Sequence, residues 1–196
     1  MAKNLKELMI EIDAFKAEVE ALRPLKPEQE QRNFQKFRHD WTYHSNAIEG
    51  NKLTQGETRV FLLEGLTADG KPMKDHLDIR GHNEVIDFLL HFIRGQEPLT
   101  EAVIREMHKV LLVETYKATA ITPEGQPTEK WIKLGEYKSV PNQVATITGE
   151  IRRFTLPEDT QVKMRELVEW YRCETNKKEL HPVIIAALIH HQFVAI

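Results

Sequence analysis

Ser45 and Glu49 are the two side chains whose types and spacing best suit chemistry. They stand four residues apart in the stretch SNAIEG, so on a helix their side chains share a face and can touch. The serine hydroxyl can then hold the carboxylate in one rotamer and direct it at a cation. Glu49 also precedes Gly50 at the expected end of a helix, where the helix dipole disfavours a carboxylate by about 0.3–1 kcal/mol. This unfavourable position suggests a function. A surface Ser–Glu pair beside a glycine cap, without any role, explains the same pattern.

Other catalytic chemistries find little support. The sequence has nine histidines but no H-E-x-x-H pattern, and the adjacent His190 and His191 point in different directions on a helix, so no metal site is predicted. Cys173 has no electropositive neighbourhood in the sequence and is expected to be a packing residue rather than a nucleophile. His108 is a conceivable base, but a hydrogen-bonded interface histidine is the simpler interpretation.

The composition is that of an ordinary soluble protein. The chain has 196 residues, 41% hydrophobic and 29% charged, with a net charge of -3, which fits one domain and gives no basic footprint for nucleic acid. A single cysteine excludes an internal disulfide and suits a reducing cytoplasm. The N-terminus lacks a signal-peptide core, and nothing before residue 180 approaches a membrane span. We therefore expect a cytoplasmic protein that contacts neither membrane nor nucleic acid through this region.

Apolar spacing predicts a mainly helical fold. Gly50 is expected to end one helix, Thr54 and Glu57 to form a capping box that starts the next, and Thr100 to cap a later one. A loop containing Pro123, Gly125 and Pro127 is expected over residues 118–130. The expected helices cover residues 4–22, 28–49, 54–63, 74–94, 100–114, 158–174 and the run from Pro182 to the end.

A lone β-hairpin is expected in EYKSVPNQVATIT, with its turn at Pro141-Asn142. Two strands alone are only marginally stable in water, so this hairpin should pack against the helices. Its exposed edge can accept an extended peptide by backbone pairing. A structural flap without any ligand remains the alternative.

The terminal run from Val183 to Ile196 has 11 apolar residues among 14, which predicts a helix buried nearly all round. No cap or polar exit follows it. A free carboxylate at the end of a core helix is unfavourable, so we expect the natural polypeptide to continue past Ile196.

Three stretches together resemble the Fic/DOC family, whose members transfer AMP from ATP to a hydroxyl side chain of a target protein. SNAIEG matches the inhibitory-helix pattern S/T-x-x-x-E-G/N, LGEYKSVPNQVATITG is similar to the family's flap, and ELHPVIIAALIHHQFVAI resembles the helix before the signature HPFxDGNGR. The resemblance implies a mainly α, Fic-type helical bundle with one β-hairpin flap and with its C-terminal catalytic part missing from this chain.

The resemblance also assigns roles to residues. Glu49, Ser45 and Gly50 become the inhibitory element, in which the glutamate binds the signature arginine and ATP binds unproductively. The flap residues beside nucleotide and target are Thr146, Ile147, Thr148 and Gly149. Lys138 stands where the family usually has arginine, so bidentate contacts are weaker there. The catalytic histidine, the phosphate-binding turn and the Mg²⁺ ligand are expected after Ile196, so residues 1–196 alone are expected to be inactive.

These assignments divide the chain into an N-terminal helical region with the inhibitory helix, residues 1–63, and an incomplete Fic core, residues 64–196. The implied function is an autoinhibited protein adenylyltransferase that uses ATP and Mg²⁺ on an unidentified target protein. Glu49 is a candidate for assisting de-AMPylation as well. Family habit makes a homodimer plausible. The alternative from another class is a non-catalytic helical interaction module.

Overall fold

The computed structural model describes residues 4–121, 126–146 and 148–196. The chain forms two compact units, residues 1–41 and residues 42–196. The division at residue 63 that the sequence suggests is one of function, and it stays a prediction.

The first unit consists of one helix and most of a second. Helix α1 spans Leu5–Ala21 and starts with a capping box between Asn4 and Glu7. Helix α2 spans Pro27–Ile48 and runs on into the second unit. Proline suits the first position of α2 because its missing N–H would have no helical partner there. Both helices agree with the apolar spacing of the sequence.

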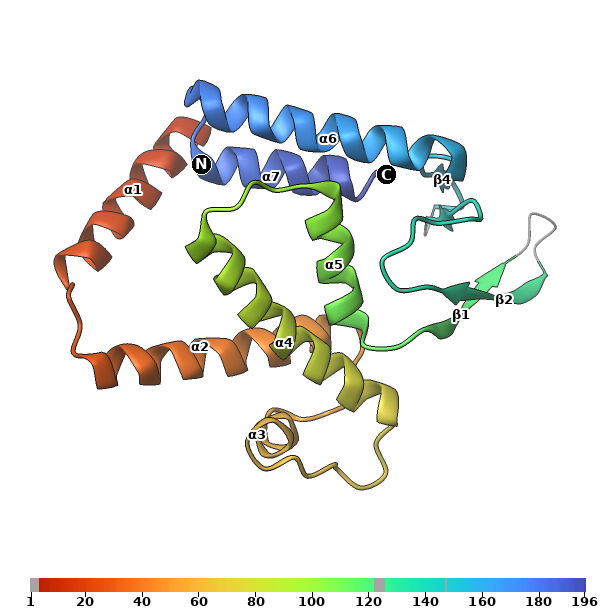
Figure 1. Ribbon diagram of the computed structural model, residues 1–196, viewed down its shortest axis with the longest axis horizontal. Helices are drawn as coiled ribbons and strands as arrows, with labels where there is room; N and C mark the ends of the chain where they lie inside the picture. The colour runs from red at the N-terminus through yellow and green to blue at the C-terminus, as the bar shows by residue number, and fades with distance from the viewer. Residues whose placement is uncertain (1–3, 122–125, 147) are drawn as a thin grey trace. The chain divides into compact units, whose positions relative to one another are not determined.

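The second unit is built from helices whose starts and ends follow their caps. Thr54 and Glu57 form the predicted capping box, and Thr100 caps its helix through the backbone N–H of Val103. The helices are α3 (Gln55–Glu64), α4 (Met73–Gly95), α5 (Glu101–Leu112), α6 (Pro157–Lys177) and α7 (Pro182–Phe193). Helix α4 packs on α5, and α6 packs on α7 (Figure 1). Among the described residues, the buried apolar side chains are Leu53, Ile79, Ile86, Met164, Leu167, Val168 and Ile185.

Gly81 lets α4 and α5 approach closely. A Cβ atom at this position would lie 2.0 Å from the carbonyl oxygen of Leu111 and 2.9 Å from a methyl group of Val113. No side chain fits at such distances, so the contact between these two helices depends on glycine.

The described residues form two antiparallel hairpins where the sequence predicts one. Strands β1 (Tyr116–Ile121) and β2 (Pro127–Ile132) pair with each other, so the loop predicted over residues 118–130 is wrong at both of its ends, while its residues 122–125 lie outside the described residues. Strands β3 (Gln143–Ala145) and β4 (Ile151–Arg153) form the flap hairpin. Its turn lies after β3 rather than at Pro141-Asn142, which precedes the first strand.

Helix α7 and Cys173 are more exposed than the sequence predicts. Ile185 is the buried residue of α7, while Val183, Leu188 and Phe193 are all exposed. Among the described helices only α6 packs on α7, so one face of α7 is covered and the expectation of burial all round is wrong. Cys173 is exposed on α6 and does not pack in the core.

Candidate functional site

Glu49 lies directly after the last residue of α2, and its side chain is exposed. Gly50 follows with φ +89°, a left-handed conformation that ends the helix and that a side chain would disfavour. Ser45 is half-buried one turn earlier. The two side chains make no hydrogen bond or ion pair with each other or with any other described residue. The Glu49 carboxylate is therefore available to a cation that these residues do not supply.

The last turns of α2 are fixed to α4 by a buried polar network. Thr42 is fully buried, and its Oγ1 lies 3.2 Å from Nδ1 of His82, to which it is hydrogen-bonded. Asn46, also buried, donates from Nδ2 to the carbonyl oxygen of Thr42 at 2.9 Å. Burial lowers the pKa of His82, so the neutral imidazole is favoured in this network. These contacts fix the rotation of the last turns of α2 about the helix axis, and with it the direction in which the chain reaches Glu49.

The connection after Glu49 is held just as firmly. The carbonyl oxygen of Asn46 accepts from the backbone N–H of Asn51 at 3.0 Å. Asn51 then donates from Nδ2 to the carbonyl oxygen of Asp75 at 2.8 Å, and Oδ2 of Asp75 accepts from the N–H of Lys52 at 2.8 Å. Because both sides of Glu49 are tied to α4, its backbone is positioned although its side chain is exposed.

The side chain of Thr146 stabilises the turn of the flap hairpin by hydrogen bonds. Its Oγ1 accepts from the N–H of Glu150 at 3.0 Å and lies 2.8 Å from Oγ1 of Thr148. Gly149 donates its N–H to the carbonyl oxygen of Thr146 at 2.9 Å. Thr148 and Gly149 are exposed. Ile147 lies outside the described residues.

The base of the flap meets the end of α7. The N–H of Thr155, two residues after β4, donates to the carbonyl oxygen of Ala195 at 3.3 Å. The ammonium group of Lys138 donates to the carbonyl oxygen of Ile196. Burial, with a smaller contribution from the nearby Lys130, lowers the pKa of Lys138. The structure therefore brings the flap segment and the terminal turn of α7 together.

The segment before the flap is fastened to α5. His108 accepts at Nδ1 from the N–H of Gly135 at 2.9 Å, and Arg105 donates from Nε to the carbonyl oxygen of Gly135 at 2.5 Å. Tyr137 donates to Oε2 of Glu101 at 2.5 Å, and burial together with this hydrogen bond raises the pKa of Tyr137 to about 12. Burial lowers the pKa of His108. His108 is thus the hydrogen-bonded interface histidine that the sequence suggests.

The two candidate regions are not joined by any described contact. No interaction links Glu49 to the flap among residues 4–121, 126–146 and 148–196. Within those residues, no group of three or more His, Cys, Asp or Glu side chains has the arrangement of a metal site. No described helix is long and apolar enough to cross a membrane.

Sequence reasoning missed the residues that position the site. Asn46, Asn51 and Asp75 contact one another across the fold, and only the Asn after Gly50 gave a local signal, as a residue suited to a turn. Lys130, which bonds Asn142 at 3.0 Å beside the flap, lies in a stretch expected to be a loop.

The comparison with family models matches the Fic/DOC family over residues 98–196, from before α5 to the end of α7. The match covers half of the chain and includes the flap. This chain belongs to the Fic/DOC family. The region that contains Ser45 and Glu49 lies outside the matched residues.

Relatives and solved structures agree with the Fic/DOC assignment. The chain is 27% identical over 155 residues to the protein adenylyltransferase Fic of Nematostella vectensis, covering 79% of this chain and 32% of the relative. It is 30% identical over 154 residues to the Drosophila melanogaster protein of the same name, covering 79% of this chain and 27% of that relative. The chain thus spans about a third or less of these curated relatives.

Among solved structures, a Fic domain containing signaling protein from Bacteroides thetaiotaomicron matches with a TM-score of 0.83 and 38% identity, over 94% of this chain and 64% of that one. A Fic family protein from Desulfovibrio desulfuricans matches with a TM-score of 0.68 and 16% identity, over 100% of this chain and 53% of that one. The second likeness supports the fold alone. Both confirm a mainly helical Fic fold.

Proposed function

We propose that this chain is the regulatory and target-docking part of a protein adenylyltransferase. The observation that carries the proposal is the contact between the flap base and the last turn of α7, through Thr155 with Ala195 and Lys138 with Ile196. The family signature is expected directly after Ile196, so its catalytic histidine would begin beside the flap. Family membership and the relatives named protein adenylyltransferase support AMP transfer from ATP to a protein hydroxyl.

The flap is the proposed docking site for the target. Strands β3 and β4 pair only with each other among the described residues, so each keeps an edge that an extended segment of the target can bind through its backbone. Val144 and Ile151 are exposed on this hairpin and offer apolar contact. Thr146, Ile147, Thr148 and Gly149 form the proposed surface beside nucleotide and target.

Glu49 is the proposed inhibitory residue, called the brake below, which would keep ATP from binding productively. Its carboxylate is exposed and unpaired among the described residues, while Asn51 and the carbonyl of Asp75 fix the backbone beside it. A carboxylate held in this way suits a bidentate ion pair with an arginine, which the resemblance places in the signature. That ion pair would take the arginine from the γ-phosphate of ATP. Ser45 is proposed to steady the carboxylate when the pair forms.

The phosphates of ATP and the Mg²⁺ ion are expected to bind outside this chain. The described residues contain no group of three or more His, Cys, Asp or Glu side chains arranged as a metal site, and HPFxDGNGR does not occur in residues 1–196. ATP is the substrate of the proposed reaction, and its phosphates and Mg²⁺ would be held by signature residues. What this chain contributes is the glutamate brake and the flap.

The test uses the natural polypeptide that contains residues 1–196, carrying Glu49→Gly to remove the brake. It is incubated with Mg²⁺ and with ATP labelled at either the α- or the γ-phosphate, and protein-bound label is measured. AMP transfer predicts label from the α-phosphate and none from the γ-phosphate. Label from the γ-phosphate alone would indicate phosphoryl transfer, and the absence of both would favour a non-catalytic interaction module. Either result would overturn the proposal.

A further inference from the structure

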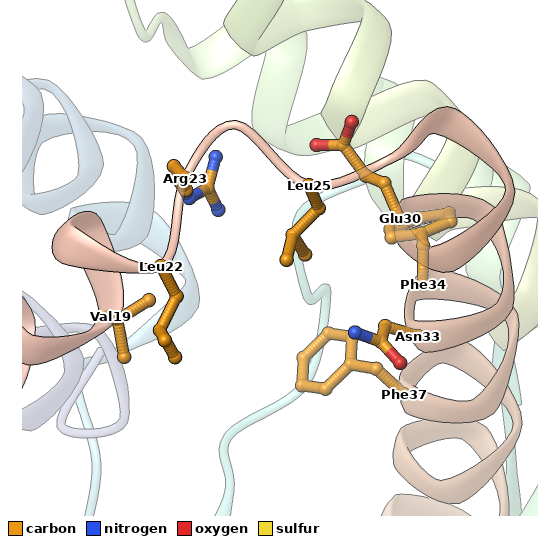
Figure 2. A pocket seen from close by; sticks show the side chains of 8 residues that line it. All are labelled: Val19, Leu22, Arg23, Leu25, Glu30, Asn33, Phe34 and Phe37. Carbon is orange, nitrogen blue, oxygen red and sulfur yellow. The ribbon is translucent and has the colours of Figure 1, made fainter.

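The cavity beside the flap, called the flap cavity below, differs in chemistry from an apolar cleft within residues 1–41. In that cleft, apolar side chains such as Val19 and Phe37 border the space between α1 and α2 (Figure 2). The flap cavity measures about 150 Å³ and is lined by α5, β2 and the segment that leads to β3. The charged residues in its lining are Lys130, Lys133, Lys138 and Glu136. Because Lys133 and Glu136 form an ion pair at 3.3 Å, the lining carries a surplus of positive charge.

Lys130 and Lys138 form no ion pair with an acidic side chain in the part of the chain that the structure describes. Lys130 donates to Oδ1 of Asn142 at 3.0 Å, and Lys138 donates to the carbonyl oxygen of Ile196. After the larger effect of burial, the positive charge of Lys130 also lowers the pKa of Lys138. The two ammonium groups therefore lie near enough to repel each other, and an anion bound by both would relieve this repulsion.

His108 lines the same cavity from α5. Its Nδ1 accepts from the N–H of Gly135 at 2.9 Å, so the proton of the neutral ring is on Nε2. Burial lowers the pKa of His108, which favours this neutral form. Nε2 has no hydrogen-bond acceptor among the described residues and is thus available to donate to a ligand.

The size and access of the flap cavity suit one short side chain. Exposed residues border it, among them Trp131 and Val140, so a ligand can enter from solvent. A water molecule occupies about 30 Å³ of liquid, so the cavity has room for about five waters or one carboxylate side chain. The donors in the flap cavity are side chains, whereas phosphate sites are typically built from backbone N–H groups at helix N-termini or in nests. A carboxylate is therefore the better fit.

The flap cavity adjoins the start of the flap hairpin. Asn142 lines the cavity and directly precedes β3, and its carbonyl oxygen accepts from the N–H of Phe154 at 3.3 Å. Thr146, the first of the residues proposed to lie beside nucleotide and target, is four positions later, about 13 Å along an extended strand. A target segment bound along β3 would therefore extend from the flap turn to the cavity.

We propose that the flap cavity is a subsite for an acidic side chain of the target protein, bound by Lys130 and Lys138 and lying within about five residues of the modified hydroxyl. This inference rests on the proposed function, because it assigns part of the target specificity to the flap. Backbone pairing along β3 distinguishes few sequences by itself. The subsite would add a preference for Asp or Glu near the modified residue.

The first experiment detects the anion site without any catalysis. The natural polypeptide that contains residues 1–196 is treated with sulfosuccinimidyl acetate, and mass spectrometry measures how fast each lysine is acetylated. The tripeptide acetyl-Gly-Asp-Gly-amide at about 20 mM should slow acetylation of Lys130 and Lys138 about twofold or more, because a bound carboxylate favours the unreactive ammonium form. Acetyl-Gly-Asn-Gly-amide with an equal concentration of sodium chloride should slow neither, and inorganic phosphate is the third probe.

Lys117 is the internal control for this measurement. It is exposed on β1, and its cross-strand partner is Trp131, whereas Lys130 is paired with the next residue of β1. Because neighbouring residues of a strand point to opposite faces, Lys117 and Lys130 belong to different faces of the same hairpin. The aspartyl tripeptide should leave the acetylation rate of Lys117 unchanged.

The second experiment tests whether the target supplies the anion. The Glu49→Gly variant of the same polypeptide is given Mg²⁺, ATP labelled at the α-phosphate, and peptides with one hydroxyl side chain and a single aspartate at varied positions. At one position, aspartate should raise kcat/KM about tenfold over asparagine, the effect of one charge-assisted hydrogen bond. Adding Lys130→Gln should bring this ratio toward one, and adding Lys130→Glu should favour lysine at the same position. Lys117→Gln is the matched control and should keep the ratio.

The outcomes distinguish this inference from the proposed function. Unprotected Lys130 and Lys138, or protection by inorganic phosphate but not by the aspartyl tripeptide, would overturn the acidic subsite whatever the catalysis. Labelled peptides without a preference for aspartate, or a preference that survives Lys130→Gln, would overturn its role in target selection. Protection of both lysines with no peptide labelled would instead contradict the proposed AMP transfer, and with it the assignment of the anion to a target.

Discussion

Asn51 ties the end of α2 to the start of α4 by donating from Nδ2 to the carbonyl oxygen of Asp75 at 2.8 Å. Its Oδ1 also accepts from the N–H of Leu53 at 3.0 Å. The side chain thus satisfies a group in its own loop and a group 24 residues later in the chain, both near the proposed brake. The position of Glu49 is therefore set by tertiary contacts rather than by helix propensity.

Replacing Asn51 should destabilise this connection. Asn51→Ala leaves the carbonyl of Asp75 and the N–H of Leu53 without these partners, which should cost about 1–3 kcal/mol of unfolding free energy. Urea denaturation measures the change. Asn176→Ala, at an exposed position near the end of α6, is the control and should change stability little. Equal effects of the two substitutions would contradict a structural role for Asn51.

Gly81 and Gly56 give a matched pair of glycines in helices. Gly81→Ala would place a Cβ 2.0 Å from the carbonyl oxygen of Leu111 and should lower stability by about 1–3 kcal/mol or more as α4 and α5 separate. Gly56→Ala meets no atom within 4 Å and should raise stability by about 0.5–1 kcal/mol through helix propensity. Thermal and urea unfolding measure both. A tolerated Gly81→Ala would mean that the two helices do not approach as described.

Two half-buried histidines should make stability depend on pH. Burial lowers the pKa of His82 and of His108 below the ordinary value of 6.5, so the unfolded chain binds protons more readily than the folded one. Their contribution to stability is present above pH 6.5 and is lost as pH falls through the folded-state pKa values. Urea unfolding between pH 7.5 and pH 5 should show a declining free energy. In the double variant His82→Gln/His108→Gln, the free energy of unfolding should decline less steeply as pH falls. A decline parallel to that of the wild-type protein would contradict the role of these two histidines.

The flap turn should loosen when the hydroxyl of Thr146 is removed. Thr146→Val deletes the acceptor for the N–H of Glu150, and loss of one such hydrogen bond should speed local amide exchange about fivefold. Hydrogen exchange across residues 143–153 measures it. Thr128→Val, an exposed threonine on β2 of the other hairpin, is the control and should leave flap exchange unchanged. An unchanged rate of amide exchange in Thr146→Val would mean that the hydroxyl does not stabilise the turn.

Local chemistry made much of the helical fold predictable. The capping box of Thr54 and Glu57, the cap at Thr100 and the glycine end of α2 all formed where the sequence predicts them. Such caps are decided by residues within one turn of each other. The Fic fold itself followed from three stretches in order along the chain, and the family comparison confirmed it.

Contacts between distant segments were not predictable in this way. The β1–β2 hairpin looked like a loop because its Pro and Gly residues outweighed the strand pattern, and its pairing depends on contacts across the connection. The flap turn was placed at Pro141 although the side chain of Thr146 holds the actual turn. The hydrogen bond between Thr42 and His82 joins residues 40 apart, and no spacing rule indicates it.

The most direct test of the account is the rate of AMP transfer by the natural polypeptide containing residues 1–196, compared with its Glu49→Gly and Glu64→Gly variants. Glu64 is the matched control, since it is the exposed last residue of α3 and also precedes a glycine. We predict that Glu49→Gly raises the rate about tenfold or more, the effect of losing a charge-assisted hydrogen bond, while Glu64→Gly leaves it unchanged. Equal rates in all three proteins would contradict the brake at Glu49.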